Sequence, residues 1–236
     1  MHSICVFDVI ETMLDLRALD PHFERIFGEA AARQEWFQQL LQSALVATVT
    51  NAYTDFGAIG KAALDMTAER RGVELGDDER QQILGAVRHL PPHPDVEPGL
   101  EQLRDAGFRL AALTNSTEEV ARTQLNHAGL ANYFEQIMSV DAVRRFKPAP
   151  EVYRMAADRL DVPIEGLRLV AAHAWDVAGA QRAGCATAFV ARSGKVLDPL
   201  AKRPDVVGVD VRTIAAQIVA IEANTHDEAT ASISGL

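Results

Sequence analysis

The sequence has few cysteines, no long apolar run and no excess of positive charge, and each shortage narrows what the protein can be. Its two cysteines, Cys5 and Cys185, fall in apolar segments, so we expect reduced core residues of a cytoplasmic protein. No apolar run approaches the roughly 20 residues that span a bilayer, and no basic segment or cleavage site precedes the first apolar run, so neither a membrane nor a secretory signal is expected. With 23 basic and 33 acidic residues, the net charge of −10 disfavours nucleic acid as a partner.

The sequence does contain an ordinary balance of apolar and charged residues. Of its 236 residues, 48% are apolar and 24% charged, which suits one large domain or a core with one insertion. The apolar run Ile4–Phe7 is too short for a free-standing helix and is typical of a buried parallel strand. Asp8 follows it directly, at the strand end where open α/β sheets place their chemistry.

Residues 15–92 are predicted to be helical almost throughout. Apolar residues at three- and four-residue spacing predict helices over 22–27, 29–50 and 56–71, and Asp77 can cap a last one. Residues 90–99 contain four prolines and a glycine, which predicts a stiff connector. We therefore interpret residues 15–92 as a helical cap inserted into a core made of residues 1–14 and 93–223.

After the connector, short apolar runs alternate with helical patterns. Strands are expected at 108–113, 134–140, 167–172, 187–190 and 205–209, and helices at 100–106, 117–128, 151–160, 173–183 and 212–223. This alternation predicts an α/β fold with a doubly wound, Rossmann-like parallel sheet. The polar residues 224–236 are predicted to form a disordered tail.

Reactive side chains stand where the predicted strands end. Asp8 follows the first strand and Thr114 the second, Lys147 precedes a helix, and Asp176 follows a later strand. The carboxyl ends of parallel strands open on one edge, so these groups can converge there. A desolvated Asp8 can act as a nucleophile and form an ester, with hydroxyls from Thr12 and Thr114.

The two remaining charged groups have supporting roles in this interpretation. Lys147 keeps carboxylates ionised and can bind an anion, and Asp176 can hold Lys147 or polarise a hydrolytic water. Each residue also has a structural alternative: Asp8 and Asn115 as caps of turns or helices, and Lys147 and Asp176 as ordinary residues of helix starts. The four segments in this order favour the catalytic interpretation.

The same segments resemble the haloacid dehalogenase (HAD) superfamily, and more narrowly its type II 2-haloacid dehalogenases. The resemblance rests on Phe7–Asp15, Leu113–Ser116, Phe146–Pro148 with Tyr153, and Ala174–Ala180, and it extends over about residues 3–222. It implies a HAD-type core with a helical cap and a hydrolase acting on carbon–halogen bonds. In that family the Asp displaces halide from a short 2-haloalkanoic acid, and water then hydrolyses the ester to the 2-hydroxy acid. The resemblance implies no cofactor, and it makes a homodimer a candidate assembly.

The resemblance also assigns site residues. It makes Asp8 the nucleophile, with Thr12, Lys147 and Asp176 as supporting catalytic residues. The substrate and halide pocket is expected to contain Ile10, Trp36, Phe37, Leu41, Phe56, Thr114, Asn115, Tyr153, His173 and Trp175.

Ile10 separates this chain from the phosphatases of the same superfamily. Those enzymes have a second Asp at this position, which protonates the leaving alkoxide and helps to bind magnesium. Ile cannot donate a proton, whereas a halide needs none to leave. We therefore expect a dehalogenase without metal, with a phosphatase as the disfavoured alternative.

Four positions depart from the type II pattern. Phe37 replaces an Arg that helps to bind halide, Ala171 a Ser, His173 an Asn, and Glu11 a Gly. The halide site is then either rebuilt, with N–H donors from His173, Trp36 and Asn115, or lost. A rebuilt site would suit fluoride and a fluoroacetate-type defluorinase. A lost site would leave a protein that binds a small carboxylate without turnover. For His173 alone, the structural alternative is that it only fills space beside Trp175.

Overall fold

The strands form one parallel sheet that confirms the predicted doubly wound α/β fold. The structure is a computed structural model that describes residues 4–233, with side chains up to residue 223. Its strands are β1 (Ile4–Phe7), β2 (Arg109–Thr114), β3 (Gln136–Ser139), β4 (Leu167–Ala171), β5 (Ala186–Val190) and β6 (Val206–Gly208). Their order is β3-β2-β1-β4-β5-β6, and every neighbouring pair is parallel. The chain order reverses on either side of β1, and this switch point opens a crevice at the carboxyl ends of the strands.

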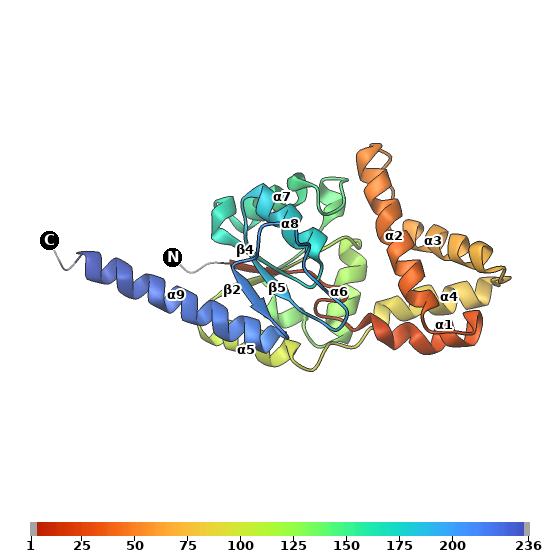
Figure 1. The fold of residues 1–236 in the computed structure, drawn as a ribbon, viewed down its shortest axis with the longest axis horizontal. Coiled ribbons are helices and arrows are strands. Elements are labelled where there is room, and N and C mark those ends of the chain that lie inside the picture. Colours follow the sequence, from red (N-terminus) through yellow and green to blue (C-terminus); the bar gives the residue numbers. More distant parts are fainter. Residues whose placement is uncertain (1–3, 234–236) are drawn as a thin grey trace.

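Helices cover both faces of this sheet (Figure 1). They are α5 (Val96–Asp105), α6 (Glu118–His127), α7 (Pro150–Leu160), α8 (Ala174–Ala183) and α9 (Val211–Ile233). Helix α7 packs against α8, and α5 packs against α9 on the opposite face. The strands are almost completely buried between these layers, as expected for a parallel sheet.

The segment between β1 and α5 is helical, as predicted, and lies apart from the sheet in Figure 1. It contains α1 (Asp20–Phe27), α2 (Ala32–Val49), α3 (Phe56–Arg71) and α4 (Asp77–Ala86), with short 3₁₀ turns at Leu16–Leu19 and Val87–His89. Helix α3 begins where Asp55 accepts a hydrogen bond from the Ala58 N–H, which satisfies a free amide of the first turn. We keep the name cap for residues 15–92.

Two predicted boundaries were wrong. Helix α5 begins at Val96 rather than near residue 100, because Pro98 lies in the first helical turn, where a missing N–H costs nothing. Helix α9 continues to Ile233, so the disordered tail predicted for 224–236 is wrong for 224–233, a stretch without Gly or Pro to end a helix. The remaining residues of that tail lie outside the described residues.

Two further features bear on the exclusions drawn from the sequence. Cys5 and Cys185 are buried and unpaired. Within residues 4–233, the helices are too short or too polar to cross a bilayer.

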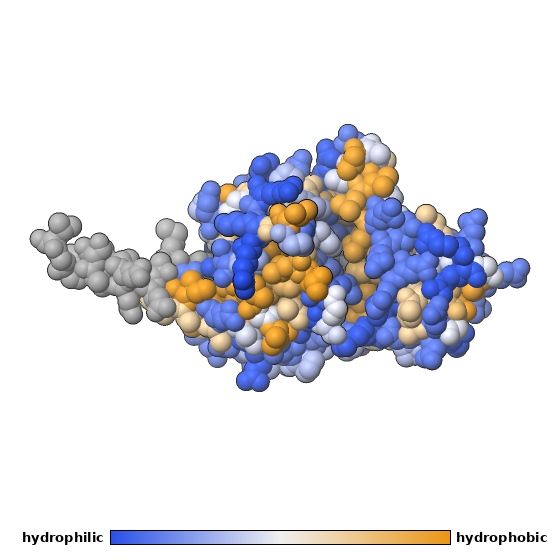
Figure 2. Space-filling view, in the orientation of Figure 1, coloured by the Kyte–Doolittle hydropathy of each residue, from blue (hydrophilic) through white to orange (hydrophobic). Residues whose placement is uncertain are grey.

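Figure 2 shows apolar side chains gathered on the surface over the outer part of α2.

Candidate active site

Asp8 lies at the carboxyl end of β1, at the switch point of the sheet. Its N–H donates to the Val170 carbonyl at 3.0 Å, which continues the β1–β4 pairing for one residue past the strand. The neighbouring strands supply Thr114 as the last residue of β2, Asn115 directly after it, and His173 after β4. The topology therefore brings together the side chains that the sequence places at strand ends.

Lys147 joins two carboxylates in the interior. Its Nζ lies 3.0 Å from Asp8 Oδ1 and 2.9 Å from Asp176 Oδ2, and its side chain is fully buried. The Tyr153 hydroxyl donates to Asp176 Oδ1 at 2.6 Å. Both carboxylate oxygens of Asp176 are therefore engaged, and this residue holds Lys147 in place.

The electrostatics keep Asp8 ionised despite its burial. Burial alone would raise the pKa of the Asp8 carboxyl, but Lys147 and His173 outweigh it and hold that pKa below its usual range. Burial would likewise lower the pKa of Lys147, yet Asp176 and Asp8 raise it above its ordinary value. Asp8 is thus an anion at neutral pH, which a nucleophile requires.

Thr12 fixes the orientation of the Asp8 carboxylate. Its hydroxyl donates to Asp8 Oδ2 at 2.6 Å and accepts from the Ala172 N–H at 2.9 Å. Because the hydroxyl oxygen already accepts a hydrogen bond from the Ala172 N–H, the hydroxyl hydrogen points at Asp8.

His173 contacts the same carboxylate from the other side. Its Nδ1 lies 3.2 Å from Asp8 Oδ2 and its Nε2 2.9 Å from Glu11 Oε2. Burial would lower the pKa of His173, but the hydrogen bonds to Asp8 and Glu11 raise it to about 9. The ring also stacks on Trp175, with centroids 5.1 Å apart. Both ring nitrogens therefore face carboxylates, which favours an imidazolium paired with Asp8 over the alternative that His173 only fills space beside Trp175.

Glu11 is a residue of this site to which the sequence alone assigned no role. It replaces a family glycine, keeps a positive φ of 65°, and accepts from both His173 and Lys195. The departures at positions 11 and 173 are therefore two halves of one ion pair. The sequence did contain a signal for this pair, because an acid and a base stand at two positions where the family has neutral residues.

A small cavity opens beside Asp8. Its volume is about 20 Å³, enough for about one water molecule. It is lined by Asp8, Ile10, Phe37, Leu41, Phe56, Thr114, Asn115, His173 and Trp175. All of these were predicted site residues.

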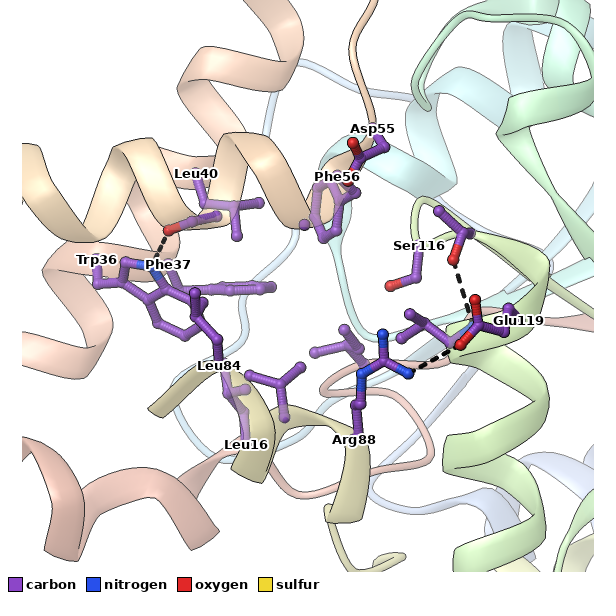
Figure 3. A pocket seen from close by; sticks show the side chains of 16 residues that line it. Leu16, Trp36, Phe37, Leu40, Asp55, Phe56, Leu84, Arg88, Ser116 and Glu119 are labelled. Carbon is purple, nitrogen blue, oxygen red and sulfur yellow. Dashed lines mark hydrogen bonds and ion pairs between the residues drawn. The ribbon is translucent and has the colours of Figure 1, made fainter. Parts of the chain in front are cut away.

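A larger cavity of about 370 Å³ lies between the cap and the core. It shares Ile10, Phe37 and Phe56 with the small cavity, and Figure 3 shows the rings of Phe37 and Phe56 projecting into it. Arg88 stands on its other side, paired with Glu119 at 3.1 Å. The shared side chains place this mostly apolar space next to the small cavity.

Three polar side chains of the predicted halide site differ in which of their hydrogen-bonding groups already have a partner. The Trp36 indole N–H donates to the Gly60 carbonyl at 2.9 Å in the cap interior, so the prediction that Trp36 supplies a free donor is wrong. The Thr114 hydroxyl accepts from the Ser116 N–H. Asn115 accepts from the Lys147 N–H through Oδ1, which leaves its amide NH₂ as the donor at the small cavity.

Comparison with known proteins agrees with this geometry. Residues 2–184 match the family model of haloacid dehalogenase-like hydrolases. The chain is 35% identical over 193 residues to (S)-2-haloacid dehalogenase 1 of Pseudomonas sp. (strain CBS-3), covering 81% of this chain and 85% of that protein. Its fold is similar to the L-2-haloacid dehalogenase of Xanthobacter autotrophicus solved with chloropropionic acid covalently bound, with a TM-score of 0.86, 26% identity, and coverage of 92% of this chain and 98% of that one. The chain therefore belongs to the haloacid dehalogenase-like hydrolases, in the branch of the type II 2-haloacid dehalogenases.

Proposed function

We propose that this protein hydrolyses short 2-haloalkanoic acids to 2-hydroxy acids through an ester on Asp8. The observation that carries the proposal is the anionic Asp8 carboxylate, held by Lys147 and Thr12 at the edge of a small cavity. Relatives named (S)-2-haloacid dehalogenases support the same substrate class.

In the first step, an Asp8 oxygen attacks C2 of the substrate. The carbon–halogen bond breaks with its electron pair on the halide, so the step needs no proton donor. We expect the Asn115 amide NH₂, which lies at the small cavity, to donate to the leaving halide. Lys147 supplies the positive charge that keeps Asp8 ionised and can attract the substrate carboxylate.

In the second step, water attacks the Asp8 carbonyl carbon and the ester is hydrolysed. The sequence left two roles open for Asp176, and its contacts with Lys147 and Tyr153 favour the positioning of Lys147. Apolar walls from Phe37, Leu41 and Phe56 limit the access of bulk water to the ester.

The phosphatase alternative lacks support at one position. Ile10 lines both cavities, and phosphate-ester hydrolysis in this superfamily needs an acid there. Its apolar side chain instead suits a halide leaving group. We also propose a cytoplasmic location, which the two unpaired, buried cysteines support.

Halide release from a substrate panel tests this proposal. The panel contains (S)- and (R)-2-chloropropionate, chloroacetate and fluoroacetate, each with EDTA, with Asp8→Asn in parallel. We expect release that survives EDTA and falls to background in Asp8→Asn, because an amide cannot displace halide. Intact-mass measurement during turnover would show the substrate carbon skeleton on Asp8 and so separate an enzyme from a carboxylate binder. Magnesium-dependent phosphate-ester hydrolysis without halide release would contradict the proposal.

A further inference from the structure

We propose that Thr48 and Tyr53 of the cap are positioning residues, which hold the loop that carries Lys147 in its reactive place. This inference rests on the proposed dehalogenase function, in which Lys147 acts through its charge beside Asp8. The loop consists of residues 140–149, and we call it the lysine loop. Thr48 and Tyr53 are not among the described residues that line the small cavity, so both act through Lys147 rather than on the substrate.

The lysine loop has little regular structure of its own to fix it. It runs from β3 to α7, and among its residues, all of which are described, only Val140–Ala142 form a short 3₁₀ turn. Arg144 keeps a positive φ of 52°, which a residue with a side chain maintains only where surrounding contacts support it. The core holds the loop near its end, where Asn115 accepts from the Lys147 N–H at 3.0 Å. The middle of the loop therefore depends on other partners.

Thr48, in the last turn of α2, provides two hydrogen bonds to the middle of the loop. Its Oγ1 accepts from the Phe146 N–H at 3.0 Å. Its carbonyl oxygen accepts from Arg145 Nη1 at 2.6 Å, as a carbonyl of the last helical turn can, because it lacks the usual partner further along the helix. One cap residue thus binds the two residues that directly precede Lys147.

Tyr53 contacts the lysine loop at three further points. Its hydroxyl donates to Asp141 Oδ1. Its ring centroid lies 4.9 Å from that of Phe146 and 5.2 Å from the guanidinium carbon of Arg144. Burial and the Asp141 carboxylate raise the pKa of Tyr53 above its ordinary value, so the hydroxyl keeps its proton and remains a donor. The cap is therefore joined to this loop from Asp141 to Phe146.

Phe146 links these cap contacts to the reaction site. Its side chain is fully buried, and its ring lies 5.7 Å from that of Phe56, which lines the small cavity. The next residue is Lys147, whose Nζ lies 3.0 Å from Asp8 Oδ1. A shift of Phe146 would reach Lys147 across a single peptide unit. Since a misplacement of about 1 Å in an active site can cost about 100-fold in rate, the cap contacts bear directly on turnover.

A displaced Lys147 would also change the charge state of Asp8. Burial raises the pKa of the Asp8 carboxyl, and Lys147 is the largest of the opposing influences, ahead of His173 and Thr12. On its other side Lys147 meets Asp176, which would keep the ammonium group if the contact with Asp8 lengthened. The pKa of Asp8 would then rise. Because only the carboxylate displaces halide, the acid limb of halide release would move to higher pH.

Single-turnover halide release from Thr48→Val and Thr48→Ser tests the proposal, with (S)-2-chloropropionate or the panel acid that gives most halide. Thr48→Val keeps the branched shape but loses the acceptor for the Phe146 N–H. We expect it to slow release about three- to tenfold, the order that one ordinary hydrogen bond corresponds to, and to move the acid limb to higher pH. Thr48→Ser retains the hydroxyl and should restore both the rate and the pH profile.

Thr50→Val is the matched control. The Thr50 hydroxyl lies at the same end of α2 but donates to the Val46 carbonyl of its own helix at 2.7 Å, so this variant should match the parent protein. Tyr53→Phe, which loses only the hydroxyl bonded to Asp141, gives an independent test and should shift the acid limb in the same direction.

Urea unfolding at the assay pH identifies the variants that are folded. A folded Thr48→Val or Tyr53→Phe variant with the rate and pH profile of the parent would overturn the proposal. Slower release with an unshifted acid limb, or an equal loss in Thr48→Ser, would also overturn it, because a structural defect alone would then account for the loss. Failure of the dehalogenase function itself would instead appear as no halide from the parent protein.

Discussion

At the residue scale, the charge on Asp8 depends on the groups around it. Asp8 is 7% exposed, and burial without partners would neutralise its carboxylate. Lys147, Thr12 and His173 together meet both of its oxygens. The nucleophile is therefore ready for attack before substrate arrives, and the site avoids the cost of reorganising around it.

His173 should make stability depend on pH. Its pKa is about 9 in the folded protein against 6.5 as a free side chain. The group binds its proton more tightly when folded, so its stabilisation is complete below pH 6.5 and is lost as pH rises through 9. The shift corresponds to about 3 kcal/mol. In urea unfolding, the difference between the parent and His173→Asn should shrink by about that amount from pH 6 to pH 10.

The control for this prediction is His127→Asn, which replaces an exposed histidine of α6 outside the site. A parent-minus-His173→Asn difference that stays constant from pH 6 to pH 10 would mean that His173 carries no extra proton in the folded state.

The sequence named most of the side chains that surround Asp8 in the structure but gave Glu11 no role. Asp8, Thr12, Lys147 and Asp176 were predicted because each follows or precedes a predicted element in family order. Glu11 was not, because its meaning depends on His173, a residue 162 positions away in the chain. A pairing of that kind is a tertiary relation, which neither periodicity nor local motif spacing can reveal.

At the element scale, α8 fixes the segment that carries Lys147. A Cβ built on Gly179 would lie 2.4 Å from the Pro148 Cβ and 2.8 Å from the Pro148 carbonyl oxygen. Helix α8 therefore approaches the backbone next to Lys147 more closely than any side chain would allow. The glycine is required for this contact rather than for a special backbone angle.

Gly179→Ala should consequently damage both stability and catalysis. The added methyl must displace Pro148 and with it Lys147, so we expect about 1–3 kcal/mol of destabilisation, as for overpacking, and at least about a tenfold loss of turnover. Urea unfolding and halide release measure the two effects. Gly85→Ala in α4 is the matched control, because a Cβ there meets nothing within 4 Å; it should be neutral or slightly stabilising. Parent-like turnover in Gly179→Ala would show that this contact does not position Lys147.

The sequence could predict which segments are helices and which are strands, because periodicity reflects burial. It could not predict where some of these elements begin or end. The run at Ile4–Phe7 was predicted at its observed bounds. At α5 the prolines were interpreted as a connector, although Pro98 fits the first helical turn. At α9 a polar composition was taken for disorder, although it contains no residue that ends a helix before Gly235.

At the scale of the whole molecule, the cap turns an open sheet edge into an enclosed site. Phe37, Leu41 and Phe56 come from α2 and α3, yet they line the same cavity as Asp8 and His173 from the core. The sequence predicted helices for the cap and an α/β sheet for the core. It could not give their relative placement, because the contacts between them join residues that are distant in the chain.

The outer side of the cap is the surface that we expect a second copy of the chain to cover. Leu45, Val46 and Val49 of α2 and Met66 of α3 are 42%, 55%, 80% and 43% exposed, and Figure 2 shows apolar side chains gathered over α2. Grouped apolar exposure of this kind marks protein interfaces, and the resemblance to type II enzymes makes a homodimer the expected assembly.

Sedimentation should then give a mass near twice 25.7 kDa for the parent. The double variant Val46→Glu/Val49→Glu should sediment near 25.7 kDa, because two carboxylates would have to be buried in the interface. Val196→Glu, equally exposed at 78% but away from the cap, should leave the mass of the parent unchanged. A parent that sediments near 25.7 kDa, or a dimer that survives both glutamates, would exclude this face as the interface.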